Sequence, residues 1–332
     1  MDADVLVVGA GWAGATVARE LADAGRRVLV VEQRDHIGGN AYDYYTAEGV
    51  LVHKYGAHIF HTNSERVWQW VSRFTAWHPY RHRVLAWVGG KLVPVPINLD
   101  TMEALGGEQA AREAIYTPYT RKQWGPFADQ LDPSVLARVK VRQNRDPYYF
   151  ADTYQGLPLD GYTRTFERIL DHPGITVQLN TPHERVMAQG WTGPVVYSGS
   201  IDGWFGECYG KLPYRSARFK FGAAIYERSA GVVNYPSPNV PYTRVADFRQ
   251  MTGQVHDVRV LAYEYPTEYG DPFWPVPTAI SEALADRYRA LAAEVPDVHF
   301  IGRLGSYRYY DMHQVIAQAL TLARTLIGKE AA

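Results

Sequence analysis

Residues 4–14 constrain the fold of this chain more than any other stretch, because they join a short apolar strand to a glycine turn that opens a helix. In such a turn the first glycine permits a tight bend, the second lets a phosphate approach the backbone, and the third lets helix pack on strand. The spacing therefore predicts a dinucleotide-binding α/β unit that holds a pyrophosphate at the start of the helix. The predicted contact residues are Gly9, Gly11, Trp12, Ala13 and Gly14.

The residues after this turn complete a strand–helix–strand unit. A helical stripe of apolar residues ends at Gly25, and a second apolar strand, residues 27–31, leads to Glu32. Glu32 lies 18 residues after Gly14, close to where a carboxylate accepts hydrogen bonds from ribose hydroxyls in such folds. We therefore expect Glu32 and the adjacent Gln33 to contact the cofactor.

A second glycine pair, Gly38 and Gly39, lies just beyond this carboxylate, where an NAD-binding fold normally proceeds to its next helix. The segment 34–42 resembles the extended fingerprint of the FAD-binding family that includes amine oxidases, phytoene desaturases and nucleotide-sugar mutases. This resemblance implies FAD as the cofactor, with Gly39 and Asn40 among its contacts. Considered by turn chemistry alone, the same glycines also fit a surface turn.

The composition excludes several classes of protein. The 332 residues suffice for roughly two domains, and 34 basic against 35 acidic side chains leave no net field favouring nucleic acid or an anionic membrane. Cys208 is the single cysteine, so the chain can form no internal disulfide and no thiolate metal site. The sequence has neither an apolar N-terminal signal nor a continuous apolar span. We therefore expect a cytoplasmic protein without a membrane span.

The cofactor domain is predicted to be discontinuous. Its first part, residues 1–66, needs further strands and a closing helix from later in the chain. Residues 181–210 hold a short apolar strand before a glycine turn, and residues 289–332 hold another strand and a helical apolar stripe. We expect Asp311 to cap that last helix and Gly328 to end it.

The middle of the chain has the pattern of antiparallel sheet. Residues 84–93 predict a hairpin around Gly89-Gly90, and residues 217–227 and 256–265 are typical of strands. An antiparallel-sheet substrate domain is assigned to residues 81–97, 138–180 and 211–288, and a helical domain to residues 67–80 and 98–137. The predicted fold class is thus α/β, with a separate antiparallel sheet and a helical insert.

Several motifs along the chain specify this architecture further. They lie at residues 55–62, 119–125, 154–158, 161–163, 198–202, 212–216, 239–244 and 302–313. In this order they closely resemble those of the UDP-galactopyranose mutase family, and the resemblance runs nearly end to end. It implies a discontinuous FAD-binding, Rossmann-like domain of the glutathione-reductase type beside the sheet domain.

The resemblance also implies an unusual use of the cofactor. In that family N5 of reduced FAD attacks the anomeric carbon of the sugar, the nucleoside diphosphate leaves, and the opened sugar recloses as a furanose before the diphosphate returns. No net oxidation occurs. The implied substrate is UDP-galactose or a related nucleotide sugar, and the implied partner is a reductant such as NAD(P)H or a flavin reductase.

Two arginines carry the implied chemistry of the leaving group. Arg138 and Arg244 match the family's pair that grips the pyrophosphate, and a guanidinium suits this task because its planar fork binds phosphate oxygens in a bidentate way. By the same resemblance His58 and Asp311 complete the catalytic set beside the flavin.

The remaining site residues follow from the resemblance position by position. Tyr119 matches the residue that stacks on uracil, and Trp124 the one packed over galactose. Tyr149 and Tyr309 match residues that reach phosphate or sugar oxygens. The other implied substrate contacts are Asn239 and Trp274. The other implied flavin contacts are His58, His61, Gly199, Arg303, Tyr310, Asp311 and Met312. A metal site is not expected, because no third ligand accompanies the two histidines at a suitable spacing.

The chain departs from its family in the helical insert. Between Leu99 and Tyr119 it has fewer residues than the resemblance implies, so the nucleotide contacts and the homodimer interface of that domain are open questions here. Ile115 stands where a uracil-stacking Phe is usual, and losing one stacking face costs on the order of 1–3 kcal/mol of base affinity. Trp274 replaces a phosphate-binding tyrosine. Whether residues 125–138 close over substrate is likewise open.

Three functions compete on this sequence. The first is a pyranose/furanose mutase, favoured by the paired arginines and the tyrosines. The second is an FAD-dependent oxidase or desaturase of the amine-oxidase type, which needs an apolar or amine-binding tunnel. The third is a catalytically silent flavin-binding interaction protein, which only the shortened insert favours.

Overall fold

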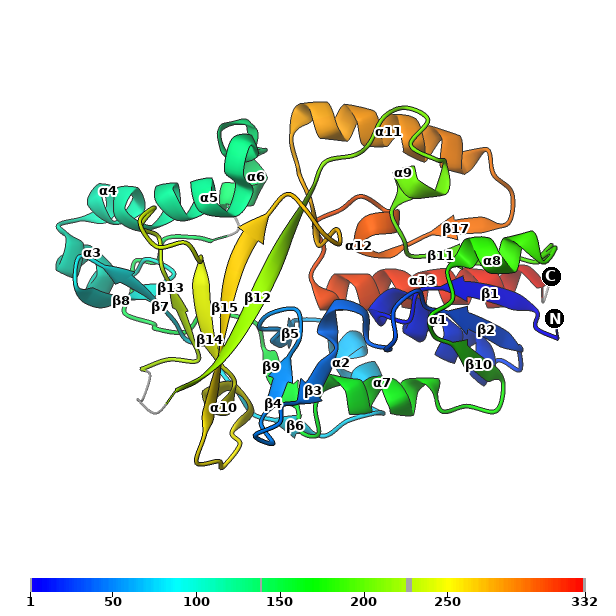
Figure 1. Ribbon diagram of the computed structural model, residues 1–332, viewed down its shortest axis with the longest axis horizontal. Coiled ribbons are helices and arrows are strands. Elements are labelled where there is room, and N and C mark those ends of the chain that lie inside the picture. Colours follow the sequence, from blue (N-terminus) through cyan, green and yellow to red (C-terminus); the bar gives the residue numbers. More distant parts are fainter. Residues whose placement is uncertain (1, 138, 225–228, 331–332) are drawn as a thin grey trace.

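A parallel sheet forms one end of the molecule. The computed structural model describes residues 2–137, 139–224 and 229–330, and both ends of the chain lie beside this sheet (Figure 1). The strand order is β10-β2-β1-β11-β17, and every neighbouring pair is parallel. The strands run Val5–Val8 (β1), Val28–Val31 (β2), Ile175–Gln178 (β10), Val195–Tyr197 (β11) and Val298–Phe300 (β17).

Alternate residues of β1 contribute to two hydrophobic cores, one on each face of this sheet. Val5 and Val7 belong to the larger core, together with helices α1 (Trp12–Asp23) and α13 (Met312–Glu330). Leu6 belongs to the smaller core on the other face. Burial on both faces explains why these strands are continuous apolar runs.

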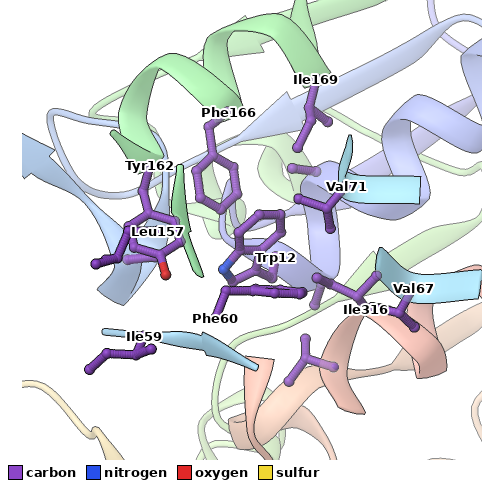
Figure 2. Close-up of a cluster of buried hydrophobic side chains, with 14 of the residues drawn as sticks. Trp12, Ile59, Phe60, Val67, Val71, Leu157, Tyr162, Phe166, Ile169 and Ile316 are labelled. Carbon is purple, nitrogen blue, oxygen red and sulfur yellow. The ribbon is translucent and has the colours of Figure 1, made fainter. Parts of the chain in front are cut away.

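The side chain of Trp12 lies in the larger core (Figure 2). Its ring centroid lies 6.1 Å from that of Phe60, 6.2 Å from that of Tyr162 and 4.5 Å from that of Phe166. The indole is only 6% exposed, and its Nε1 donates a hydrogen bond of 3.2 Å to the sulfur of Met312. Of the residues predicted to contact the cofactor, Trp12 can therefore do so only through its backbone.

A seven-stranded sheet forms the other end of the molecule (Figure 1). Its order is β16-β12-β15-β14-β13-β7-β8, antiparallel throughout except for the parallel pair β13–β7. The predicted hairpin is confirmed, and its turn residues Gly89 and Gly90 have φ values of 56° and 83°, as a type I′ turn requires. The strands run Val84–Val88 (β7), Lys91–Val95 (β8), Tyr214–Ala224 (β12), Val232–Asn234 (β13), Arg244–Asp247 (β14), Arg259–Thr267 (β15) and Trp274–Pro275 (β16).

Two small antiparallel sheets lie between the large ones (Figure 1). One pairs β3 (Asp43–Tyr45) with β4 (Leu51–His53), and the other has the order β5-β9-β6. The strands of the latter run Phe60–Thr62 (β5), Trp77–His78 (β6) and Tyr154–Pro158 (β9).

The helical insert formed by residues 98–137 lies across one end of the strands of the seven-stranded sheet (Figure 1). It consists of α3 (Leu99–Leu105), α4 (Glu108–Ala111), a π-helical turn at Arg112–Tyr116, α5 (Thr117–Trp124), a 3₁₀ segment at Gly125–Gln130 and α6 (Pro133–Ala137). The other helices are a 3₁₀ turn at Gly39–Ala41, α2 (Glu65–Ser72), α7 (Tyr162–Leu170), α8 (His183–Ala188), α9 (Ile201–Trp204), α10 (Phe248–Thr252), α11 (Ala279–Ala293) and α12 (Gly302–Gly305). Within the described ranges no helix is both long and apolar enough to cross a membrane.

The α/β fold class is confirmed, but several details differ from the sequence-based expectations. Residues 67–80 were assigned to the helical domain, but α2 contacts β5 and α13, and β6 pairs with β9. Strand β10 pairs with β2 in the parallel sheet, although residues 138–180 were assigned to the substrate domain. A short edge strand looks the same in either sheet, so its partner could not be read locally. Gly328 does not end α13, which continues to Glu330; a glycine inside a helix costs only about 1 kcal/mol relative to alanine.

Candidate active site

The first glycine turn leaves the start of α1 open to a ligand. Gly11 is the N-cap of α1 and, as a glycine, has no side chain that could occupy the first backbone amides of the helix. Gly9 has a φ of +99°, a conformation that favours glycine, and a Cβ on Gly14 would lie 1.9 Å from the Gly9 carbonyl oxygen. The turn thus needs glycine at these positions, and it presents backbone amides at a helix N-terminus, where phosphate binds well.

The second glycine pair packs directly on the first turn. A Cβ on Gly39 would lie 3.0 Å from the Cα of Gly11, and a Cβ on Gly11 would lie 3.5 Å from the Cα of Gly39. The Gly38 amide also donates a 2.9 Å hydrogen bond to the Ala10 carbonyl. The two glycine segments therefore form one cradle, which distinguishes Gly38-Gly39 from an isolated surface turn.

Glu32, directly after β2, stabilises this cradle through hydrogen bonds to backbone amides. Its carboxylate is 7% exposed, and Oε2 accepts a 2.9 Å hydrogen bond from the Ala10 amide while Oε1 accepts one of 3.0 Å from the Arg34 amide. Each oxygen keeps a second lone pair with which it could accept from a ribose hydroxyl. The neighbouring Gln33 is exposed.

A cleft of about 1230 Å³ opens beside this cradle, lined by residues from the cofactor part, the helical insert and the seven-stranded sheet. Twelve of the sequence-predicted residues line it: Asn40, His58, His61, Tyr119, Trp124, Tyr149, Arg244, Trp274, Arg303, Tyr309, Asp311 and Met312. These residues come from distant parts of the chain. The fold therefore assembles one site from motifs that the sequence shows separately.

Other predicted residues lie elsewhere. Asn239 is exposed on the loop between β13 and β14 and does not line the cleft. Gly199 packs against the ring of Tyr197, and Tyr310 also lies outside the cleft lining, where its carbonyl accepts hydrogen bonds from Arg303. Arg138 lies outside the described residues.

Asn234 is a cleft residue that was not predicted from the sequence. This residue is 9% exposed, lines the cleft and ends β13 opposite Arg244 of β14. A signal existed in the sequence, since a single amide side chain ends the apolar run Val232-Val233. The resemblance implied Asn239 instead, because this residue begins the motif at residues 239–244.

Arg244 is held by a buried carboxylate on the neighbouring strand. Its Nε donates a 2.6 Å hydrogen bond to Oε2 of Glu264, whose side chain is only 3% exposed. Burial alone would lower the pKa of Arg244, but the Glu264 carboxylate outweighs it and raises the pKa. The terminal guanidinium nitrogens make no hydrogen bond within the described chain, so a cationic group remains at the cleft for an anion.

His58 is neutral in this site. Its Nδ1 lies 2.8 Å from the Gly56 carbonyl oxygen and so carries the proton that it donates there. Burial, followed by the neighbouring His53 and the charges of Arg303 and Arg244, lowers the pKa of His58 to about 3. Its Nε2 is thus left as a hydrogen-bond acceptor at neutral pH.

The aromatic wall contains protonated hydroxyls and packed rings. Burial raises the pKa of Tyr119, so its hydroxyl remains a hydrogen-bond donor at neutral pH. The rings of Trp124 and Tyr309 lie 5.7 Å apart, and the guanidinium of Arg303 lies 5.6 Å from the Tyr309 ring centre. Arg303 also donates to the carbonyls of Phe273 and Tyr310, which fixes this wall of the cleft.

The fold brings Asp311 and His313 next to His61, so that one ligand atom from each lies within 4.8 Å of the others. A third ligand could not be recognised in the sequence, because Asp311 and His313 are remote from His61 along the chain. Nδ1 of His61 already pairs with Oδ2 of Asp152 at 3.0 Å, and the imidazole stacks on Phe150. The absence of a metal stays a prediction.

Comparison with known proteins identifies the family. The family described as UDP-galactopyranose mutase matches residues 114–309, more than half of the chain. The chain belongs to this family. A second family, described as NAD(P)-binding Rossmann-like domain, matches residues 7–74, which contain the glycine cradle. The protein is accordingly an isomerase of the nucleotide-sugar pyranose/furanose mutase type, similar to UDP-galactopyranose mutase.

Relatives of this mutase family match almost the whole chain. A probable UDP-galactopyranose mutase from Klebsiella pneumoniae is 36% identical over 371 residues, covering 99% of this chain and 96% of the relative. A dTDP-fucopyranose mutase from Escherichia coli is 33% identical over 370 residues, covering 97% and 98%. A crystal structure of reduced UDP-galactopyranose mutase has a TM-score of 0.78 over 99% of this chain and 94% of that one, at 14% identity. Since the alignments are longer than the 332-residue chain, these relatives contain segments that it lacks.

Proposed function

We propose that this mutase interconverts the pyranose and furanose forms of UDP-galactose or a related nucleotide sugar, with reduced FAD as its cofactor. The observation that carries the proposal is the position of Arg244: its guanidinium is fixed by Glu264 at the same cleft that His58, Tyr119 and Arg303 line. A cation at a nucleotide-sized cleft beside a dinucleotide cradle fits a substrate with a diphosphate.

The residues present fit FAD. The backbone amides at the start of α1 are suited to a pyrophosphate, since no side chain caps them, and Glu32 can accept a hydrogen bond from the ribose. When bound, reduced FAD supplies the nucleophile that attacks the anomeric carbon. The reductant that maintains this state is NAD(P)H or a flavin reductase.

Arg244 stabilises the departing diphosphate in this proposal. A preorganised cation in a cleft screened from water acts most strongly where negative charge develops, which here is the leaving group. Arg138 remains the predicted second cation, on sequence grounds alone. Trp124 and Trp274 at the cleft supply apolar surface that limits access of water to the opened sugar.

The specificity for the base and for the sugar depends on the residues that line the cleft. Ile115, which by resemblance stands where a stacking phenylalanine is usual in the family, is 1% exposed and lines the cleft, so Tyr119 is left as the stacking residue. Relatives named for UDP-galactopyranose and for dTDP-fucopyranose match the chain at 36% and 33% identity. These values favour neither substrate strongly, so both belong in the test.

The test is turnover by purified protein whose flavin has been reduced with dithionite. UDP-galactose, dTDP-fucose and further nucleotide sugars are incubated with it, and furanose isomers are sought by chromatography. We expect conversion of at least one sugar only after reduction. If no sugar of the panel is converted while reduced flavin is bound, the proposal is contradicted. Reduction of the flavin by a small amine or alcohol without dithionite would favour an oxidase.

A further inference from the structure

Lys122 joins the helical insert to the seven-stranded sheet. It lies in the last turn of α5, three residues after Tyr119 and therefore on the same helix face. Its Nζ donates hydrogen bonds to three backbone carbonyls, those of Tyr235 at 2.5 Å, Ser237 at 3.1 Å and Tyr242 at 2.7 Å. All three protons of the ammonium group are thus used.

The three carbonyls belong to the loop that connects β13 to β14. Asn234 ends β13 immediately before this loop, and Arg244 begins β14 immediately after it. Both line the cleft, as does Tyr119 on the helix. The ammonium of Lys122 therefore ties the helix that carries a predicted base-stacking residue to the loop that precedes the predicted diphosphate-binding arginine.

The loop itself is well defined, so it can transmit this constraint. The Tyr235 amide donates a 2.8 Å hydrogen bond to the Thr243 carbonyl across the base of the loop. The rings of Tyr235 and Tyr242 meet edge to face, with centroids 5.0 Å apart. Lys122 holds α5 against a closed loop and not against a free strand end.

Lysine suits this position better than other long side chains. Its three ammonium protons point in different directions and can serve three carbonyls that surround one point, whereas the donors of arginine lie in a plane. Methionine has a similar shape but no donor, so it would leave three carbonyls without this partner.

We propose that Lys122 is a positioning residue that fixes Tyr119 relative to Arg244, so that the cleft can bind the base and the diphosphate of one nucleotide together. This inference rests on the proposed function for its substrate, but it concerns nucleotide binding and not the chemical step. Loss of Lys122 should therefore act on KM and on UDP affinity more than on kcat.

The experiment compares Lys122→Met with Lys91→Met in flavin-loaded protein. Lys91 is the matched control because its Nζ donates to one carbonyl, that of Ala104 at 3.2 Å, and it does not line the cleft. UDP affinity is measured by calorimetry, and KM and kcat with the sugar that the wild type converts. For Lys122→Met we expect KM and the UDP Kd to rise about tenfold or more with kcat within about threefold of wild type, and for Lys91→Met neither to change.

An unchanged KM and UDP Kd in Lys122→Met would overturn the inference, even if the melting temperature falls. A loss of kcat at unchanged KM would overturn it too. Should Lys122→Met not fold, Lys122→Gln, which keeps part of the donor capacity, decides by the same two constants. The measurement of UDP affinity does not depend on turnover. Wild-type protein that binds UDP but converts no sugar would contradict the proposed function. The comparison of UDP affinity between the variants would still test this inference.

Discussion

Arg244 and Glu264 are direct cross-strand neighbours on β14 and β15, and a 2.6 Å hydrogen bond from Nε to Oε2 joins their side chains. Glu264 is 2% exposed, so its charge would be costly to bury without a partner. The pair fixes a guanidinium at the cleft while leaving its terminal nitrogens for a ligand. Each residue thus has a separable role, Glu264 in orientation and Arg244 in contact with the substrate.

Arg244→Ala should lower kcat by about 10²–10³, the usual effect of losing a preorganised donor to developing negative charge. Flavin content should stay at the wild-type level, because the glycine cradle does not involve this residue. Steady-state kinetics and the flavin absorption spectrum are the measurements. Arg164→Ala is the control, since Arg164 is 65% exposed and pairs with Glu167 on the surface. Loss of flavin from Arg244→Ala would contradict a role confined to the substrate.

Gly39→Ala should weaken flavin binding through the contact with Gly11. Gly39 has a φ of +55°, and an added Cβ would lie 3.0 Å from the Gly11 Cα. Gly89→Ala provides a close match, because Gly89 has a φ of +56° and an added Cβ would meet nothing within 4 Å. Both variants should lose about 1–2 kcal/mol of folding stability from the left-handed backbone. FAD titration should show weaker binding for Gly39→Ala alone, and equal FAD affinity in the two variants would refute the shared cradle.

Acid should destabilise the protein through its buried histidines, of which His53 and His82 are the least exposed and His58 lies in the cleft. His53 and His82 are 1% and 5% exposed, and burial lowers the pKa of each from 6.5 to about 3. Between these values the unfolded chain binds more protons than the folded one, so this stability is complete above pH 6.5 and is lost as the pH falls toward 3. At pH 5 each histidine should cost about 2 kcal/mol.

Urea unfolding between pH 8 and pH 5 measures this loss. In His53→Gln the decrease over that range should be smaller than in wild type by about 2 kcal/mol, because one of the buried histidines that take up a proton on unfolding is gone. The same decrease in both proteins would show that burial of His53 does not control the acid response.

The sequence predicted best what depends on local spacing. The glycine turn, the acidic residue after the second strand and the hairpin at residues 84–93 each place their own backbone, and all three occur as expected. The pairing of strands that are distant in the sequence was harder to predict. The residues of the edge strand β10 do not indicate which strand it pairs with. For the same reason the approach of His313 to His61 could not be read from the chain.

The direction in which a side chain points was the second feature that could not be predicted from the sequence. Trp12 follows the glycine turn and was expected at the cofactor, but the first turn of α1 points its ring into the core beside Phe166. Asn239 and Asn234 flank the same loop, and only the register of β13 against β14 reveals which of them lies opposite Arg244. The motif at residues 239–244 therefore predicted this part of the cleft to within a few residues, but it did not predict which asparagine lies beside Arg244.

Asn234→Ala should raise KM for the nucleotide sugar, whereas Asn239→Ala should leave it unchanged. Asn234 is 9% exposed at the cleft, and its amide can exchange hydrogen bonds with a sugar or phosphate oxygen, so its loss should cost about 1–2 kcal/mol of binding, or about 5- to 30-fold in KM. Asn239 is exposed to solvent outside the cleft. Steady-state kinetics on both variants test this, with flavin content as a check that the cofactor site is intact. A larger effect from Asn239→Ala would return that residue to the site and mean that the loop folds over the substrate when it binds.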